Sequence, residues 1–586
     1  MTASKPKTEE SFLAGIFDVV LPKEAPLPAA VIKHREGWDN LGRNYRKRCQ
    51  RVRHLCSGGS KIVEMGKAIE LLEGVLEPFD RVAIEGDNQK QADFLARTLV
   101  KVDPGKIHDL HMVQSVIALP EHVEIFEKGI ARKVDFSYSG PQAARLSALL
   151  ESGKIEIGSI HTYLELYARY FIDLTPQVAL VAADYADRHG NLYTGYSTED
   201  TPVLCEATKF RNGIVIAQVN GIKDRLPRVD IQSDWIDFII QADKPYHMEP
   251  LFTRDPAAIT ETQILIAMLC LKGIYAPYQV QSLNHGVGFN TAAIELLLPT
   301  YGEQLGLKGK ICSNFILNPH PTMIPAIEAG WVKSIHSPGG ELGMENYVRA
   351  RPDIFFVGPD GNMRSNRAYA QMAGLYGIDM FIGSTLQIDQ YGNSSTATAQ
   401  RITGFGGAPN IGGDPPGRRH ATGAWMKAGA EYAFQQQLIG PMPRGKKLVV
   451  QAVETFAEGM RPTFVEELDA WKLAEKYGFP QPPVMIYADN ITHLVTEAGI
   501  AQLHKCGSLA ERSAAIKAVA GYTPLGITAS AKMTEQLRKT GIVQTPEDLG
   551  IDPTQAVRSL LAAQNIRDLV EISRGLYEPP VRFRNW

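Results

Sequence analysis

A glycine-rich stretch that ends in two arginines and a histidine is the segment of this sequence best suited to chemistry. Between Gly404 and Gly417 the chain holds six glycines and three prolines, and Arg418, Arg419 and His420 follow directly. Glycine allows positive φ angles and close backbone approach, so the N–H groups of such a loop can point at a ligand oxygen. The stretch therefore suits a thioester carbonyl or a phosphate. A surface loop whose glycines serve only its turns is an equally open interpretation at this point.

A second glycine segment precedes a helix-forming stretch. Asn284–Asn290 has the sequence NHGVGFN and is followed by TAAIELLL. Glycines between a strand and a helix N-terminus place amide donors where an anion or an oxyanion binds, although a plain strand-to-helix turn has the same pattern. Glu497, in VTEAG, is a candidate base. A carboxylate in such a turn more often caps the backbone or pairs with a cation.

Several catalytic patterns are absent from the sequence. It contains no Walker loop, no G-x-S-x-G elbow, no HExxH and no Cys/His spacing typical of a metal site. The sequence therefore supports neither serine-triad nor metal-dependent hydrolysis, and we predict no metal site.

Composition excludes further classes of protein. The net charge of −3 over 586 residues gives no case for nucleic-acid binding. The longest apolar run, Ile264–Leu271, is too short to span a bilayer. The six cysteines are scattered without a CxxC pair, and the N-terminal residues lack a convincing signal-peptide pattern. We expect a cytoplasmic protein with reduced thiols.

From residue 61 onward, short apolar strands alternate with helical periodicity, which predicts a largely parallel α/β fold. Landmarks recur in the same order about 200 residues apart, which indicates a duplicated unit. Asp187-x-x-Gly190-Asn191 recurs as Asp389-x-x-Gly392-Asn393. A shorter spacing between these landmarks predicts an insertion of roughly 25 residues in the second copy, within Gly339–Arg367.

The predicted fold is a tandem repeat of two similar open, largely parallel α/β domains with a helical C-terminal tail. We divide the chain into a basic leader (1–60), a first domain (61–255), a second domain (256–525) and a helical extension (526–586). Both glycine segments fall in the second domain. Because ligands bind beyond the carboxyl ends of parallel strands, the two segments are expected to face one cleft.

The leader contains a basic run between Arg43 and Arg53. It predicts either a docking face for an acidic or phosphorylated partner or, more commonly for such runs, a solvated helix face.

Three segments in order resemble the family I CoA-transferase superfamily, which includes citrate lyase α subunits. They are LNHGVGFNTAAIELL, DQYGN followed by GFGGAPNIGG, and ITHLVTEAGIAQLHKCGSLAERSAAI. Over nearly the whole chain, including GGAPNIGGDPPGRRHATGAW and the basic leader, the sequence resembles the α subunits of biotin-independent malonate decarboxylases.

That resemblance implies an acyl-carrier-protein transferase. Its substrates would be acetyl-S-carrier protein and malonate, and its products malonyl-S-carrier protein and acetate. It implies an acyl carrier subunit and carboxytransferase/decarboxylase subunits as partners, and no nucleic acid or membrane. The cofactor implied is the phosphoribosyl-dephospho-CoA arm of the carrier, with none attached to this chain.

One departure from the superfamily bears on mechanism. Many of its CoA-transferases carry a nucleophilic glutamate in I-H-[ST]-E, whereas the nearest segment here is Ile311-Cys312-Ser313-Asn314. An amide cannot form an acyl anhydride with the enzyme. We therefore expect malonate's own carboxylate to attack the acetyl thioester and to form a free mixed anhydride, with oxyanion stabilisation by the protein.

The expected site follows from these arguments. The predicted catalytic residues are Asn314, Gly286, Gly288, Gly406 and Gly407; the predicted substrate-binding residues are His285, Asn290, Asn410, Arg418 and Arg419. A different alignment would make Glu328, Glu341 or Glu345 a covalent nucleophile, as in a CoA-transferase or thioester hydrolase. A non-catalytic scaffold that docks a carrier protein is a third hypothesis.

Overall fold

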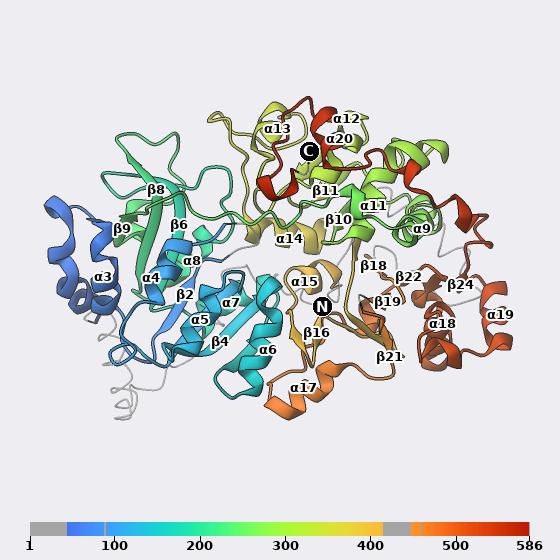
Figure 1. Ribbon diagram of the computed structural model, residues 1–586, viewed down its shortest axis with the longest axis horizontal. Helices are drawn as coiled ribbons and strands as arrows, with labels where there is room; N and C mark the ends of the chain where they lie inside the picture. Colours follow the sequence, from blue (N-terminus) through green and yellow to red (C-terminus); the bar gives the residue numbers. More distant parts are fainter. Residues whose placement is uncertain (1–43, 87–89, 414–446, 458, 585) are drawn as a thin grey trace, which may run out of the picture.

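The computed structural model describes residues 44–86, 90–413, 447–457, 459–584 and 586 (Figure 1). Two α/β halves lie side by side along the long axis of the molecule, with the first half on the left of Figure 1 and the second on the right. Each half is built on a large sheet.

The first sheet is parallel along its main path, and one short strand, β7 (Leu192–Tyr193), pairs antiparallel with β6. Successive side chains of its central strands point to opposite faces of the sheet. Both sets are buried, because helices cover both faces. The order across this sheet is β1 (Ile62–Val63), β9 (Phe238–Gln241), β8 (Ile214–Lys223), β6 (Val178–Asp187), β2 (Arg81–Ile84), β3 (Leu110–Val116), β4 (Ala131–Tyr138) and β5 (Glu156–Ile160).

Four helices pack on one face of the first sheet and two on the other. The first set is α3 (Ala68–Val75), α4 (Asp93–Leu99), α5 (Glu121–Glu127) and α6 (Ala143–Glu151); the second is α7 (Tyr163–Ile172) and α8 (Thr201–Phe210). A capping box fixes the start of α7, because Thr162 accepts from the Glu165 amide at 3.0 Å and the Glu165 side chain accepts from the Thr162 amide.

The second sheet repeats the strand order of the first. Six consecutive strands of the first sheet, β4-β3-β2-β6-β8-β9, correspond in position to β12-β11-β10-β13-β18-β22. This sheet runs β12 (Ser334–His336), β11 (Asn314–Ile316), β10 (Ser282–His285), β13 (Met380–Gly383), β18 (Leu448–Ala452), β22 (His493–Thr496), β23 (Gly499–Gln502) and β24 (Val543–Gln544), of which the last two are antiparallel additions.

The two Asp-x-x-Gly-Asn turns confirm the duplication in atomic detail. In the first copy Asn191 donates its side-chain N–H to Asp187 at 2.7 Å, and in the second Asn393 donates to Asp389 at 2.8 Å. The central glycines have φ angles of 96° and 94°. The predicted tandem repeat of two largely parallel α/β units is therefore confirmed, whereas the boundaries at residues 60, 255 and 525 stay predictions.

Helices of the second half cover both faces of its sheet. One face carries α9 (Glu261–Cys270), α11 (Phe289–Leu297), α12 (Ile324–Glu328), α13 (Glu345–Ala350) and α20 (Ile566–Ile572), and the other carries α15 (Ala408–Gly412), α18 (Leu509–Val519) and α19 (Ala531–Lys539). Two further helices, α14 (Arg367–Gly377) and α17 (Asp469–Tyr477), pack near the junction of the halves.

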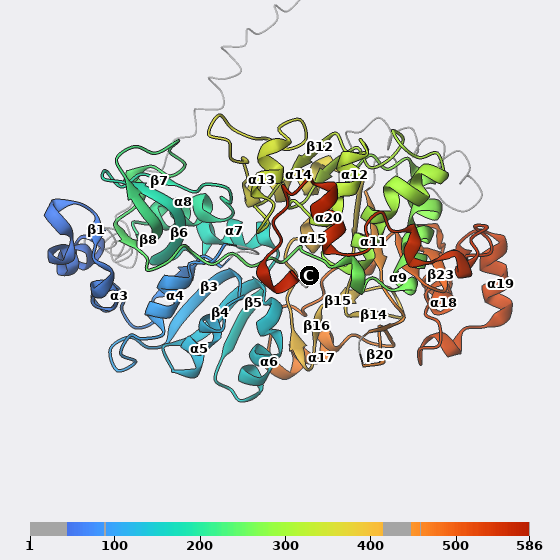
Figure 2. The same cartoon turned by 45° about the horizontal axis from the view of Figure 1, so that its top comes forward.

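The C-terminal residues form a strand of the second sheet in addition to the helices that the sequence predicts. Strand β24 extends the second sheet, and α20 lies beside α12 in both views (Figures 1 and 2). Leu569 and Tyr577 are fully buried in the core of this half. The tail is therefore part of the second half's packing and not a peripheral extension.

The described part of the basic leader begins with a helix over residues 44–52, which contacts the first half. Arg48 pairs with Asp80 at 2.6 Å and with Glu77 at 2.7 Å, and Arg51 pairs with Glu77 at 2.8 Å. Arg48 therefore belongs neither to an open docking face nor to a solvated helix face, because Asp80 and Glu77 neutralise its charge, whereas Arg46 and Lys47 are exposed.

Candidate active site

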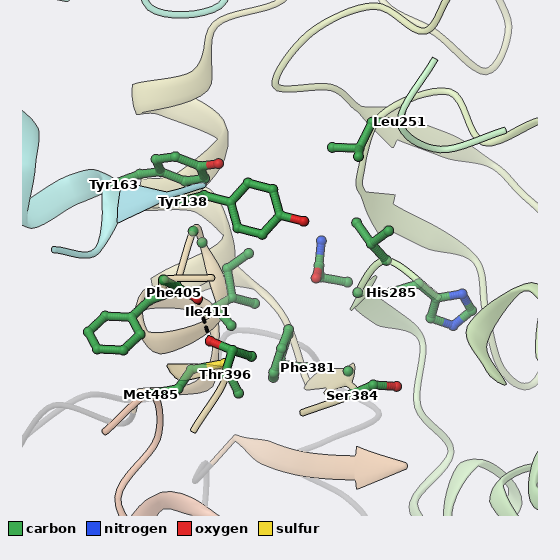
Figure 3. A pocket seen from close by; sticks show the side chains of 18 of the residues that line it. Tyr138, Tyr163, Leu251, His285, Phe381, Ser384, Thr396, Phe405, Ile411 and Met485 are labelled. Atoms are coloured by element: carbon green, nitrogen blue, oxygen red, sulfur yellow. Dashed lines mark hydrogen bonds between the residues drawn. The ribbon is translucent and has the colours of Figure 1, made fainter. Parts of the chain in front are cut away.

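A cavity of about 330 Å³ lies where the carboxyl ends of four neighbouring strands of the second sheet meet the end of β4 from the first (Figure 3). Residues 284–287 reach it after β10, Leu317 and Asn318 after β11, Pro338 after β12 and residues 383–386 after β13. Residues 403–408, from the glycine-rich loop, line the same cavity. Both glycine segments thus face one cleft.

The segment after β10 needs its first glycine for close packing. A Cβ atom on Gly286 would lie 2.9 Å from the Cα atom of Gly383, the last residue of β13. The Gly286 amide donates to the carbonyl of Ile382 at 2.7 Å. This hydrogen bond removes Gly286 from the predicted oxyanion donors, since its N–H is already used.

Gly288 precedes α11 and lines a smaller adjoining cavity, which shares Gly286 and Val287 with the main one. Its carbonyl accepts from Ala292 and Thr291, whereas its N–H has no acceptor among the described residues. An amide at the start of this nine-residue helix favours a negative charge. Its predicted role as a donor is compatible with this geometry.

The glycine-rich loop is docked on the first half. The amides of Phe405 and Gly406 donate to the Ser137 carbonyl at 2.6 and 2.9 Å, and a Cβ atom on Gly404 would lie 2.5 Å from that same oxygen. The amide of Gly406 is therefore consumed, contrary to prediction. Gly407 begins the turn into α15, and its N–H has no acceptor in the described part of the chain.

His285 does not offer its ring to the cavity. Its Nδ1 lies 2.9 Å from Glu295 and its Nε2 lies 3.0 Å from the hydroxyl of Tyr275. Figure 3 shows the imidazole turned away from the other labelled side chains. The predicted contact of this ring with malonate is wrong, because both of its nitrogens have partners within the core.

Glu295 is the centre of that buried network. It also accepts from His320 at 2.9 Å and from the hydroxyl of Thr322. Burial would raise the pKa of Glu295, but the His320 and His285 imidazoles beside it hold that pKa well below its usual range. The network fixes the strand end that carries Gly286, and His320 completes the cavity wall.

Asn314 is not at the cavity. It opens β11, so it lies at the amino end of this strand, exposed, with its side-chain oxygen accepting from Ser334 at 2.8 Å. The predicted catalytic role is therefore wrong on position. The asparagine that reaches the cavity from this strand is Asn318, four residues later, which donates to the Gly340 carbonyl at 3.0 Å.

The other predicted substrate ligands hold the loops or lie outside the described residues. Asn290 donates to the Ala452 carbonyl at 3.1 Å, and Asn410 accepts from the Leu164 amide at 3.2 Å. Neither lines the cavity. Arg418, Arg419 and His420 lie in the stretch that the structure does not describe.

Sequence reasoning missed Tyr138, the last residue of β4. Its hydroxyl points into the cavity (Figure 3) and has no hydrogen-bond partner among the described residues. Burial raises the pKa of Tyr138, while the charges of Arg254 and Arg401 act in the opposite direction. The phenol is therefore protonated at neutral pH and able to donate. Only the contact between the two halves places it here.

Two arginines line the cavity. Arg367 is fully buried and ion-paired with Glu199 and Asp200, and its guanidinium lies 4.7 Å from the centre of the Tyr163 ring. Arg401, on β17 (Arg401–Ile402), is exposed and pairs with no carboxylate of the described residues. Arg401 is thus better suited to hold a substrate carboxylate.

None of the described residues that line the cavity is an aspartate or a glutamate. Glu341 is buried elsewhere and accepts from the amides of Phe252 and Thr253 at 3.1 and 2.9 Å. Glu328 bonds Tyr347 and Arg351, and burial raises the pKa of Glu345 at the start of α13. None of these three alternative nucleophiles reaches the cavity.

Glu497 has the structural role that its turn favours. Its carboxylate accepts from the Thr455 amide at 3.1 Å and from the hydroxyl of the same residue. In the ranges that the structure covers, no group of three His, Cys, Asp or Glu side chains is placed to hold a metal ion. No helix within those ranges is long and apolar enough to cross a bilayer.

Comparison with known proteins agrees with this architecture. The family model described as malonate decarboxylase, alpha subunit, transporter matches residues 37–586. The chain belongs to this family.

Individual relatives are similar over almost the full length. The acetyl-S-ACP:malonate ACP transferase of Malonomonas rubra is 62% identical over 549 residues, which are 94% of this chain and 99% of that protein. The chain is accordingly an enzyme of the transferase class.

Two solved structures show the fold. A chain of a Pseudomonas malonate decarboxylase hetero-tetramer in complex with malonate is 56% identical, with a TM-score of 0.89 over 94% of this chain and 100% of that one. A putative citrate lyase alpha subunit from Streptococcus mutans has a TM-score of 0.55 at 16% identity, over 84% of this chain and 85% of that one. This second likeness concerns the fold alone.

Proposed function

We propose that this chain exchanges acetate for malonate on the thiol of an acyl carrier protein. The Malonomonas rubra relative is named for this activity, and the related Pseudomonas malonate decarboxylase was solved in complex with malonate; both support this assignment. The observation that carries the mechanism is a cavity lined by hydrogen-bond donors and Arg401 but by no carboxylate of the described residues. Such a site stabilises charge without supplying a nucleophile.

The reaction then uses malonate as its own nucleophile. A malonate carboxylate oxygen attacks the acetyl carbonyl carbon and forms a tetrahedral oxyanion. This intermediate collapses, the C–S bond breaks, and the carrier thiolate and a mixed acetic–malonic anhydride remain. The thiolate attacks the malonyl carbonyl carbon, and acetate leaves with the bridging oxygen.

The chain's own groups stabilise and orient these species. The amide of Gly407 and the hydroxyl of Tyr138 are the donors of the main cavity that are available to the oxyanion, and the Gly288 amide is a further donor in the adjoining cavity, which Glu295 also lines. Arg401 holds the carboxylate of malonate that does not react, since guanidinium groups match the geometry of carboxylates. The walls of the cavity keep the short-lived anhydride away from water.

The carrier's phosphoribosyl-dephospho-CoA arm would deliver the thiol to the cavity. The subunits implied by a malonate decarboxylase, a carrier and the carboxytransferase/decarboxylase components, would be this chain's partners. The Pseudomonas relative was solved as a hetero-tetramer, which supports such an assembly.

Isotope transfer in a single turnover tests the proposal. Enzyme in excess over acetyl-carrier protein is mixed with malonate labelled with oxygen-18 in its carboxylates, and the acetate is analysed by mass spectrometry. Direct attack gives acetate with one heavy oxygen in the first turnover. A covalent glutamyl route gives unlabelled acetate, because the bridging oxygen then comes from the enzyme, and it would leave an acyl group that hydroxylamine traps. Absence of any transfer would leave only a docking scaffold.

A further inference from the structure

A second cavity, of about 220 Å³, lies at the opposite edge of the first sheet from the active site. It is bordered by the amino ends of β2, β6 and β8, whereas the active-site cavity receives Tyr138 from a carboxyl end. Its walls include the three arginines Arg48, Arg81 and Arg211, together with Tyr45, Asn44 and Asn212. No carboxylate of the described residues lines it.

Arg81 is the unusual member of this set. It is half-buried at the first position of β2, and it forms no ion pair within 4 Å with any described carboxylate. Its Nη1 donates to the Thr175 carbonyl at 2.8 Å, which fixes the guanidinium and leaves Nη2 without a described acceptor. The Nε of Arg81 is buried and has no hydrogen-bond partner among the described residues, and desolvating such a donor without a partner is costly.

A second unpaired guanidinium adds to this excess charge. Arg211, at the end of α8, donates to the Ile172 carbonyl at 3.2 Å and has no carboxylate partner in the described ranges. Burial lowers the pKa of Arg81, and the charges of Asp173 and Asp135 oppose this effect; the charges of Arg211 and Arg169 also lower the pKa, to a smaller degree. Neither cation has a described carboxylate within 4 Å, so an anion bound between them would relieve their mutual repulsion beyond what Asp173 and Asp135 supply.

The wall formed by the leader helix is held in place. Arg48 is neutralised by Asp80 and Glu77, and the Tyr45 hydroxyl donates to Asp237 at 2.5 Å. These contacts leave the Tyr45 ring as a rigid side of the cavity. The basic leader therefore contributes structure here, and the free positive charge comes from Arg81 and Arg211.

We propose that this cavity binds the phosphate group of a small phosphorylated molecule between Arg81 and Arg211. Guanidinium groups match phosphate geometry with parallel hydrogen bonds. The volume exceeds that of a phosphate ion, so a monoester of sugar-phosphate size fits, with its organic part against Tyr45 and the asparagines. The phosphate arrives on a free metabolite, because the carrier's thiol must reach the opposite edge of the sheet.

Calorimetric titration of the full chain with ribose 5-phosphate and with inorganic phosphate tests this site. The ester is expected to bind more tightly than phosphate, and both affinities are expected to fall with salt. Arg211→Gln is expected to weaken binding by about tenfold or more, the effect of losing a hydrogen bond to a charged group. Because Arg211 is exposed, this variant is expected to fold normally.

Arg188→Gln is the matched control. Arg188 is also exposed, pairs with Asp224 at 2.9 Å, and follows the carboxyl end of β6. It removes the same charge from the same half without touching the cavity, and binding is expected to be unchanged. Equal loss in both variants, or no binding by wild-type protein, overturns the proposal. Competition by holo-carrier but not by apo-carrier would instead assign the phosphate to the carrier's arm. Acyl transfer should persist in Arg211→Gln, so failure here is separate from failure of the proposed reaction.

Discussion

The equivalent strands β2 of the first half and β10 of the second end in two different ways. In the first sheet β2 runs into Glu85 and Gly86, and the fully buried Glu85 pairs with Lys90 at 2.9 Å. In the second sheet the equivalent strand, β10, ends in His285 and Gly286 and opens on a cavity of about 330 Å³. The strand order is the same in both sheets, so the backbone arrangement does not explain the difference. Buried side chains fill the space at the end of β2, whereas the space at the end of β10 stays open as a cavity.

This contrast explains how one repeat supports the other. In the first half, the Glu85–Lys90 ion pair fills the space at the end of β2. Tyr138, at the end of β4 in the same half, lines the cavity of the second half. The glycine-rich loop of the second half in turn binds the first half, because the amides of Phe405 and Gly406 donate to the Ser137 carbonyl. The candidate active site is therefore formed at the junction of the halves, although most of its residues belong to one half.

The largest expected effect comes from breaking the Glu85–Lys90 ion pair at the end of β2. Lys90→Met leaves Glu85 buried without its cation, and this should lower the free energy of unfolding by about 3–5 kcal/mol. Urea denaturation followed by circular dichroism measures it. Lys133→Met is the control, since Lys133 and Glu156 form a partly exposed pair at 3.1 Å whose loss should cost about 1 kcal/mol or less. Equal losses in the two variants would show that the ion pair is not what closes this end.

Removing the donor that the first half contributes should affect transfer and spare stability. Tyr138→Phe is expected to lower kcat by about 100-fold, within the range for a lost oxyanion donor. Unfolding should change by about 1 kcal/mol or less, because the hydroxyl has no described partner in the resting fold. Tyr185→Phe, on β6 with its ring stacked on Tyr193, should leave kcat within about twofold of the wild-type value. Unchanged kcat in Tyr138→Phe would remove this residue from the mechanism.

A pair of glycine substitutions compares the two strand ends directly. An added Cβ meets the Val116 carbonyl at 2.6 Å in Gly86→Ala and the Gly383 Cα at 2.9 Å in Gly286→Ala. Each variant should lose about 1–3 kcal/mol of stability through overpacking. Only Gly286→Ala should also reduce transfer strongly, because a shift there displaces the cavity wall. Steady-state assays at a temperature where both variants are folded decide this, and equal activity would mean that the wall's position is unimportant.

The sequence was sufficient for the arrangement of elements and for the meeting of the two glycine segments. The periodicity of apolar residues, the glycines at the ends of elements and the recurring Asp-x-x-Gly-Asn turn are local signals. Each of them has a local structural cause. The roles of individual residues depend on distant partners. His285 is occupied by Glu295 and Tyr275, and Tyr138 arrives from the other repeat, so neither could be assigned from neighbouring residues.

The smallest expected effect concerns the asparagine that alignment favoured. The cavity that both glycine segments line lies at the carboxyl ends of the strands of the second sheet, and Asn314 lies at the amino end of β11 whereas Asn318 follows its carboxyl end. Asn314→Ala should therefore change kcat by about twofold or less and stability by about 0.5 kcal/mol or less. Asn318→Ala should reduce kcat/KM by more than Asn314→Ala does. Asn318 lines the cavity, and its loss leaves the buried Gly340 carbonyl without its hydrogen-bond donor. The reverse order of effects would restore Asn314 to the reaction and would require substrate to bind at the opposite edge of the sheet, where neither glycine segment could reach it.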